Sequence, residues 1–131
     1  MKKSDVVIPT GMEGFYNDFH FSPAVKDKDR LYLAGMIGLE PDGTAVKDPE
    51  KQYTQAFETL KLVLMEAGCS YSDVVEMTTF HVGLQSELQL FMKVKDRYMP
   101  EPYPAWTGIG VSELAVPGAL VEIRLVARLR S

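Results

Sequence analysis

The chain has 131 residues, of which 46% are hydrophobic and 24% are charged, and these values are typical of a globular domain rather than a disordered chain. The formal net charge of −4 at pH 7 opposes binding to phosphate backbones, so we expect no nucleic-acid partner. A single cysteine excludes an internal disulfide, and no histidine or cysteine pair has zinc-site spacing, so we expect no metal and no cofactor.

The sequence has no segment suited to secretion or to membrane insertion. The two lysines near its start are not followed by an apolar stretch of signal-peptide length, and no run of about eighteen uncharged apolar residues occurs. We therefore expect a cytoplasmic protein with no membrane partner, in which residues 1–131 form a single domain.

The first third of the chain is expected to form short strands. The segments VVIP (residues 6–9) and HFSPAV (20–25) are expected to pair as an irregular hairpin. The segment RLYLAGMIGL (30–39) has the composition of a longer strand, and a Pro-Asp-Gly turn (41–43) follows it.

The clearest helix is expected at residues 48–68. Apolar side chains recur there at spacings of three and four, which places them in one stripe along a helix. Asp48 suits the N-cap, Pro49 suits the first helical position, and Gly68 suits a left-handed residue just past the end. This helix is therefore expected to face a core.

A second, shorter helix is expected at residues 86–100. Ser86 and Gln89 have capping-box spacing, and Pro100 closes the segment. Runs of β-branched and aromatic residues predict three further strands, at residues 74–84, 106–114 and 119–129.

The last strand is expected to have one apolar and one polar face. Val121, Ile123 and Leu125 alternate with Glu122 and Arg124, and side chains along a strand point alternately to opposite faces. The sequence therefore predicts an α+β fold in which two helices cover one face of a mainly antiparallel sheet.

Few residues point directly to chemistry. The sequence has no glycine-rich phosphate loop, no nucleophile turn and no helical histidine pair, and we interpret His20, His81 and Cys69 as structural. Glu122 is an acid in an otherwise apolar strand, with Arg124 two residues on. The residues leave two interpretations open: a surface charge pair, or a functional acid whose face is covered by another subunit.

Four segments of the chain carry a family resemblance. They are LYLAGMIGLEPDG, QAFETLKLVLMEAGCSYSDVVEMTTFHV, PYPAWTGIGVSEL and VEIRLVAR. In their order and spacing they resemble the Rid family, also called YjgF or RidA and, in older naming, translation-inhibitor or L-PSP endoribonuclease proteins. The resemblance implies a Rid or chorismate-mutase-like fold with a six-stranded sheet and two helices, assembled as a homotrimer with three clefts between subunits.

The resemblance also assigns residues to these clefts. In the family's imine deaminases an arginine two residues after the proline of Pro-Ala-Arg clamps the substrate carboxylate. That position here is Trp106, which taken alone fits plain core packing. The acid that activates water in the family matches Glu122, which is the implied catalytic residue. The implied substrate-binding residues are Phe21 and Ala34, followed by Gly35 and Met36, of one subunit, facing Trp106, Thr107, Gly108 and Glu122 of its neighbour.

The resemblance is closest to the YjgH-like branch, which lacks the deaminase arginine. It implies a trimeric protein that acts on or binds a reactive imine or enamine, or another small uncharged or aromatic metabolite. As an enzyme it would be a deaminase-like hydrolase, inefficient on amino-acid-derived imines because Trp106 cannot form the bidentate contact. The alternative is a non-catalytic metabolite-binding or sensing protein. A ribonuclease is suggested only by the old family name, and the acidic charge and absence of a histidine pair count against it.

Overall fold

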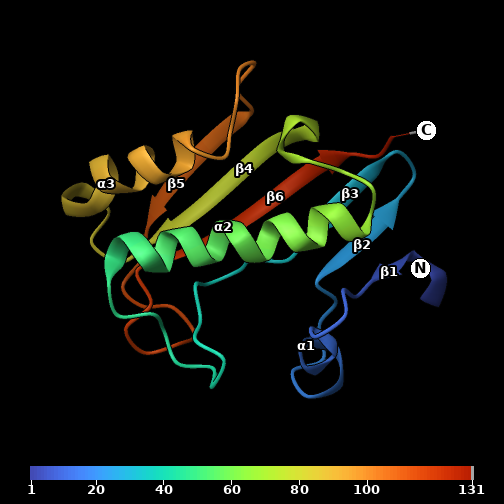
Figure 1. Cartoon of the computed structure of the whole chain (residues 1–131), viewed down its shortest axis with the longest axis horizontal. Helices are drawn as coiled ribbons and strands as arrows, with labels where there is room; N and C mark the ends of the chain where they lie inside the picture. Colours follow the sequence, from blue (N-terminus) through green and yellow to red (C-terminus); the bar gives the residue numbers. More distant parts are fainter. Residues whose placement is uncertain (131) are drawn as a thin grey trace.

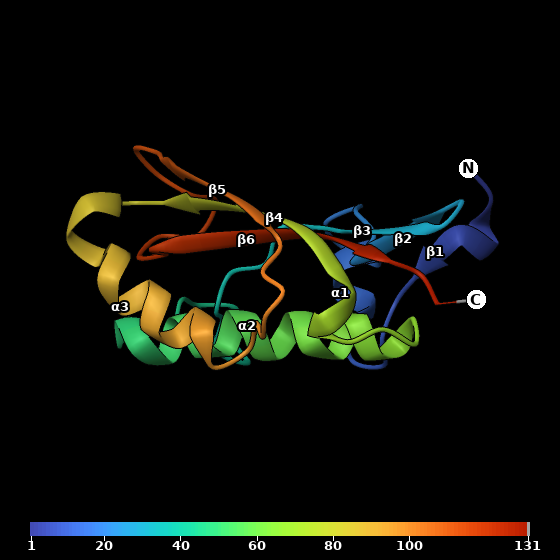
Figure 2. The same ribbon diagram turned by 90° about the horizontal axis from the view of Figure 1, so that it is seen from above.

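The computed structural model describes residues 1–130 as one six-stranded sheet with helices on one side of it (Figures 1 and 2). The elements are a 3-10 helix Lys3–Asp5, β1 Val6–Val7, α1 Glu13–Asn17, β2 Ala24–Asp27, β3 Arg30–Leu33, α2 Pro49–Glu66, a 3-10 helix Tyr71–Asp73, β4 Val74–His81, α3 Leu84–Asp96, β5 Ala105–Gly110 and β6 Val121–Arg128. The strand order is β1-β2-β3-β6-β4-β5, and every neighbouring pair is antiparallel except β4 with β5. The predicted α+β fold is confirmed.

Helix α2 begins and ends where its capping residues predict. The Asp48 side chain accepts a hydrogen bond from the Lys51 N–H at 3.0 Å, Pro49 opens the helix, and Gly68 has a φ of +75° just beyond its end. The stripe of α2 packs against the sheet and forms the centre of the core. Its buried members are Gln52, Tyr53, Ala56, Phe57, Leu60, Val63 and Leu64.

Helix α3 differs from the prediction at both ends. Gly83, with a φ of +74°, lets the chain turn directly from β4 into the helix, and its carbonyl accepts the Ser86 and Glu87 N–H groups. Ser86 therefore lies inside the first turn, where its hydroxyl donates to the Gly83 carbonyl at 3.0 Å. The predicted capping box of Ser86 and Gln89 is wrong.

Several strands are shorter than predicted. β3 stops at Leu33, and beyond it Met36 forms only an isolated bridge with Ile123. β1 and β2 do pair, with Val6 opposite Val25, but the short helix α1 lies between them in the chain. Among residues 1–130, no helix combines the length and the apolar composition that crossing a membrane requires.

The sheet has one covered and one uncovered face. The apolar side chains of β6 are buried beneath the helices, as the alternation predicts, and Glu122 and Arg124 point to the opposite face. Figure 2 shows that α2 and α3 lie on the same side of the sheet. On the uncovered face two large apolar side chains remain exposed, Tyr32 at 40% and Ile109 at 39%. These two residues lie on β3 and β5, which β6 and β4 separate, so each is a single exposed apolar side chain.

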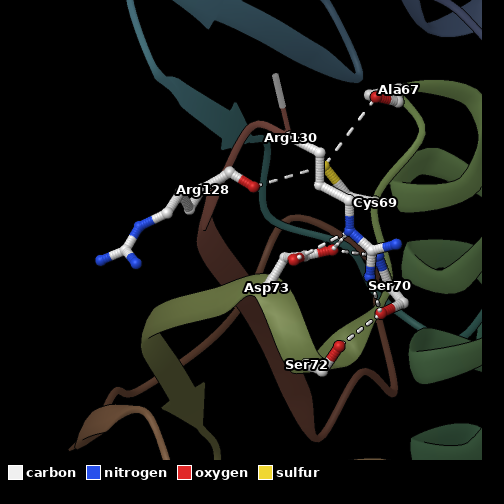
Figure 3. A network of polar contacts seen from close by, with 7 residues as sticks. All are labelled: Ala67, Cys69, Ser70, Ser72, Asp73, Arg128 and Arg130. Carbon is white, nitrogen blue, oxygen red and sulfur yellow. Dashed lines mark hydrogen bonds and ion pairs between the residues drawn. The ribbon is translucent and has the colours of Figure 1, made fainter.

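A polar network ties the end of the chain to the turn after α2 (Figure 3). Arg130 Nε donates to Asp73 Oδ2 at 2.9 Å, and Arg130 Nη2 donates to Ser70 Oγ at 3.1 Å. Burial alone would raise the pKa of Asp73, but its hydrogen bonds from Arg130 and Ser70 lower that pKa overall. The Cys69 thiol is buried and donates to the Arg128 carbonyl at 3.6 Å, which agrees with its structural interpretation.

Candidate active site

Glu122 lies in the middle of β6 on the uncovered face, opposite Phe80 of β4. Its side chain is half-buried, and this burial raises the pKa of its carboxyl group. Within residues 1–130, no hydrogen bond or ion pair reaches the carboxyl oxygens from another side chain or from the backbone. A half-buried acid without a partner is suited to proton transfer or to holding a polar ligand.

Gly35 makes the room that Glu122 occupies. A Cβ atom at position 35 would lie only 2.7 Å from the Glu122 carboxyl carbon, so any other residue would displace the acid. The neighbouring Ala34 N–H donates to the Pro23 carbonyl at 2.9 Å, which brings the segment containing Phe21 to the same place. Phe21 itself is partly exposed. The structure therefore places Glu122 against Gly35, next to Ala34, and we call these three residues the acid wall. The Phe21 ring packs on Phe15 with 5.2 Å between the ring centroids, and its place beside Glu122 stays a prediction.

Met36 does not belong to the acid wall. Its side chain is only 3% exposed and lies in the hydrophobic core. Its N–H and carbonyl both bond to Ile123 of β6, at 2.9 and 3.0 Å. Two backbone hydrogen bonds therefore fix Met36 against β6 with its side chain turned into the core, away from the acid wall, and its role in substrate binding stays a prediction.

Trp106 lies on the covered face of the edge strand β5. Its Nε1 donates to Thr79 Oγ1 at 2.9 Å, and its ring centroid lies 5.9 Å from that of Phe91 on α3. Lys95 Nζ lies 5.2 Å from the centroid of the indole ring. A Cβ atom at Gly108 would lie 3.8 Å from the indole, so Gly108 shares this side of β5. Here the packing interpretation of the tryptophan holds.

Trp106 and Glu122 do not meet within one chain. Trp106 is paired with the buried Met77 and so faces the helices, whereas Glu122 points to the uncovered face, and β4 separates β5 from β6. The expected single wall of Trp106, Thr107, Gly108 and Glu122 is therefore wrong. Thr107 points away from its two neighbours, because side chains alternate along β5. Strand alternation alone could have separated Thr107 from Trp106 and Gly108.

Two residues near Trp106 were missed by sequence reasoning. Thr79 joins the indole to the buried His81, whose Nε2 lies 2.7 Å from the same hydroxyl oxygen. Burial lowers the pKa of His81 and is consistent with its structural interpretation. Lys95 is only 7% exposed, and its ammonium lies over the rings of both Trp106 and Tyr103. Lys95 lies four residues after the buried Phe91, on the apolar stripe of α3, and this spacing was the signal that could have revealed its burial.

The described residues offer no grouping of three or more histidine, cysteine, aspartate or glutamate side chains that could hold a metal ion.

Comparison with known proteins identifies the family. A family model described as Endoribonuclease L-PSP matches residues 15–129. The chain belongs to the Rid family. This Rid chain is similar to the RutC family protein YjgH of Escherichia coli (strain K12), with 34% identity over 130 residues and 98% of each chain covered. The solved structure of protein YjgH has a TM-score of 0.87 at 34% identity, covering 96% of both chains.

A second relative has a named activity. The 2-iminobutanoate/2-iminopropanoate deaminase of Dermatophagoides farinae is 31% identical over 108 residues, which cover 81% of this chain and 83% of that protein. The resemblance inferred from the four sequence segments is thus confirmed at the level of the Rid family and of the similarity to YjgH.

Proposed function

We propose that this Rid protein is a homotrimer whose clefts between subunits hold a small molecule, with Glu122 as the catalytic acid or base. The observation that carries the proposal is the half-buried, unpartnered Glu122 carboxyl seated against Gly35. Trp106 and the acid wall lie on different faces of one chain, so a cleft containing both needs a second chain.

The chemistry that fits this site is hydrolysis of a carbon–nitrogen double bond. The Glu122 carboxylate accepts a proton from water as the water oxygen attacks the imine carbon and the double-bond electrons move to nitrogen. Glu122 then gives a proton to that nitrogen and takes the hydroxyl proton as the carbon–nitrogen bond breaks, which releases ammonia and leaves a carbonyl product. Burial raises the pKa of Glu122 and makes it a stronger base than an exposed carboxylate. The Gly35 N–H, which donates to no other residue described in the structure, is available to stabilise developing negative charge.

The proposed substrate is a small imine or enamine, or another uncharged or aromatic metabolite. Trp106 offers no guanidinium for a bidentate contact with a carboxylate, so the protein is proposed to be inefficient on amino-acid-derived imines. Ala34 adds apolar rather than polar surface to the acid wall, and Phe21 is proposed to do the same beside it. These residues together favour a flat, apolar ligand.

A non-catalytic metabolite-binding protein is the second candidate. It is favoured because Trp106 stands where the family's deaminases have the arginine that clamps the substrate carboxylate. The two candidates differ in one measurement. Ammonia release from 2-iminopropanoate, generated in the assay from alanine by an amino-acid oxidase, should be slow but should fall further in Glu122→Gln. If Glu122→Gln leaves the rate unchanged, the hydrolase proposal fails and binding remains. Crystals soaked with metabolite mixtures would then identify the ligand in the cleft.

A further inference from the structure

The only tryptophan of the chain is held by a series of hydrogen bonds beneath α3. Trp106 Nε1 donates to Thr79 Oγ1 at 2.9 Å, and the same oxygen lies 2.7 Å from His81 Nε2. Thr79 and His81 are both 0% exposed. The one hydrogen-bonding group of the indole is therefore already used inside its own chain.

The hydrogen positions in this series follow from counting donors. Thr79 Oγ1 accepts the indole N–H and has one proton of its own to donate. If it donates to His81 Nε2, the only atom left without a partner is His81 Nδ1, which the structure does leave unpaired. If His81 Nε2 donated instead, both the Thr79 hydroxyl proton and Nδ1 would be unpaired. Because buried unpaired groups are costly, the first arrangement is favoured, with the proton of neutral His81 on Nδ1.

Two further contacts fix the plane of the indole. The Phe91 ring packs on Trp106 at 5.9 Å and also meets the His81 ring edge-on at 4.8 Å between centroids. Lys95 Nζ lies over the indole at 5.2 Å. The ring is thus held by its N–H, by one aromatic neighbour and by one cation, and every one of these contacts comes from β4 or α3.

We infer that Thr79, backed by His81, is a positioning and specificity-determining residue for the cleft. The inference rests on the proposed function, because it takes Trp106 to line that cleft. With its N–H bound to Thr79, position 106 presents a bound molecule with carbon atoms and no hydrogen-bond donor. A ligand is therefore selected there by ring stacking and shape, and polar recognition falls to the acid wall.

The hydrogen bond is tested by NMR, because a single tryptophan gives a single indole N–H signal. Thr79→Val removes the acceptor at nearly constant shape, and Thr79→Ser keeps a hydroxyl as the matched control. Solvent exchange of the indole N–H should be about tenfold faster in Thr79→Val, the effect of losing one hydrogen bond, and close to wild type in Thr79→Ser. Unchanged exchange in Thr79→Val would overturn the inference.

A second measurement needs no variant and covers the case in which Thr79→Val fails to fold. The imidazole nitrogen shifts of His81 in the wild-type protein should report a proton on Nδ1. A proton on Nε2 would contradict the donor count and overturn the role of His81 as the acceptor of the Thr79 proton, because Thr79 Oγ1 would then accept from both rings.

The role in specificity is tested with benzamide, a flat uncharged aromatic probe, through the fluorescence of Trp106. Benzamide should bind Thr79→Val about three- to tenfold more weakly than wild type, and Thr79→Ser should bind it nearly normally. Equal affinities, or no binding of benzamide to a trimeric wild-type protein, would overturn the specificity role. A monomeric wild-type protein would instead overturn the proposed function and leave the hydrogen-bond series standing.

Discussion

Glu122 depends on the absence of a side chain at Gly35. The carboxyl group occupies the space that a Cβ atom at position 35 would need, so a change at either residue should affect the other, and we call Gly35 and Glu122 one steric unit. The Gly35→Ala change is therefore expected to act on the site through Glu122 rather than through backbone conformation.

Gly35→Ala should displace the Glu122 carboxyl group and destabilise the protein by about 0.5–1 kcal/mol, because the atoms that must move belong to a flexible, half-buried side chain, and this loss should disappear in the Glu122→Ala background. Urea unfolding of the two single variants and the double variant measures the coupling. Gly14→Ala is the matched control, because its Cβ atom would meet only Asp18 at 3.5 Å. Additive effects of the two changes would show that the steric unit does not exist.

Trp106 replaces the charge that would clamp a substrate carboxylate. Losing such a charge-assisted contact costs about 2–5 kcal/mol, so turnover of 2-iminopropanoate should be roughly thirty- to several-thousand-fold slower than in arginine-bearing relatives. Trp106→Arg should restore only part of this rate, since the new guanidinium would share its surroundings with the Lys95 ammonium.

Adding Glu122→Gln to the Trp106→Arg variant should abolish the gain, because an amide cannot accept a proton from water. The ammonia-release assay measures all of these variants. Rapid turnover by the wild-type protein would contradict the apolar interpretation of the cleft, and it would require another cation, such as Arg124, to reach the substrate.

At the scale of elements, β4 packs against α3 through a buried histidine. Burial lowers the pKa of His81 from its ordinary 6.5, so the unfolded chain binds a proton at a higher pH than the folded one. The free energy of unfolding should therefore fall as the pH is lowered from above 6.5 through the folded pKa of His81.

Urea unfolding between pH 8 and about pH 5 measures this dependence. His81→Leu should flatten it, and removal of the exposed histidine in His20→Gln is the matched control. The raised pKa of Glu122 changes the free energy of unfolding with pH in the opposite direction. Glu122 is present in the wild type and in both histidine variants, so its effect cancels in the comparison. An unchanged pH slope in His81→Leu would contradict the buried, neutral state of the histidine.

The sequence predicted some elements well because the residues that fix their ends lie within a few positions of one another. The cap at Asp48, the proline after it and the apolar stripe fix α2 without help from the rest of the chain. The start of α3 depends on the left-handed conformation of Gly83, which competes with the capping box at Ser86. Glu122 could be chosen from the sequence, and the resemblance also assigned Gly35 to the site. Their direct contact within one chain could not be predicted, because it joins positions far apart in the sequence.

The wall containing Trp106 was misjudged for a related reason. The resemblance placed neighbouring residues of β5 together with Glu122, although alternation sends Trp106 and Thr107 to opposite faces. Which face is covered depends on the registers of β4 with β5 and β6, and these are set by tertiary packing.

At the scale of the whole molecule, the negative net charge opposes binding to nucleic acid. The net charge of −4 should prevent binding of single-stranded RNA at physiological salt, and no cleavage should exceed that of Glu122→Gln. Fluorescence anisotropy with a labelled RNA measures the binding. Salt-sensitive micromolar binding would mean that the exposed Arg124 and Arg128 on the uncovered face outweigh the global repulsion.

The central claim is that a second chain completes the proposed site by bringing its edge strand β5, and Trp106 with it, next to the acid wall. The most direct test is the molar mass of the protein in solution at micromolar concentration, measured by light scattering. The account predicts three times the chain mass of 14.7 kDa, maintained on dilution through the micromolar range. A stable species with the mass of one chain would contradict it, because Trp106 and Glu122 could not then share a cleft.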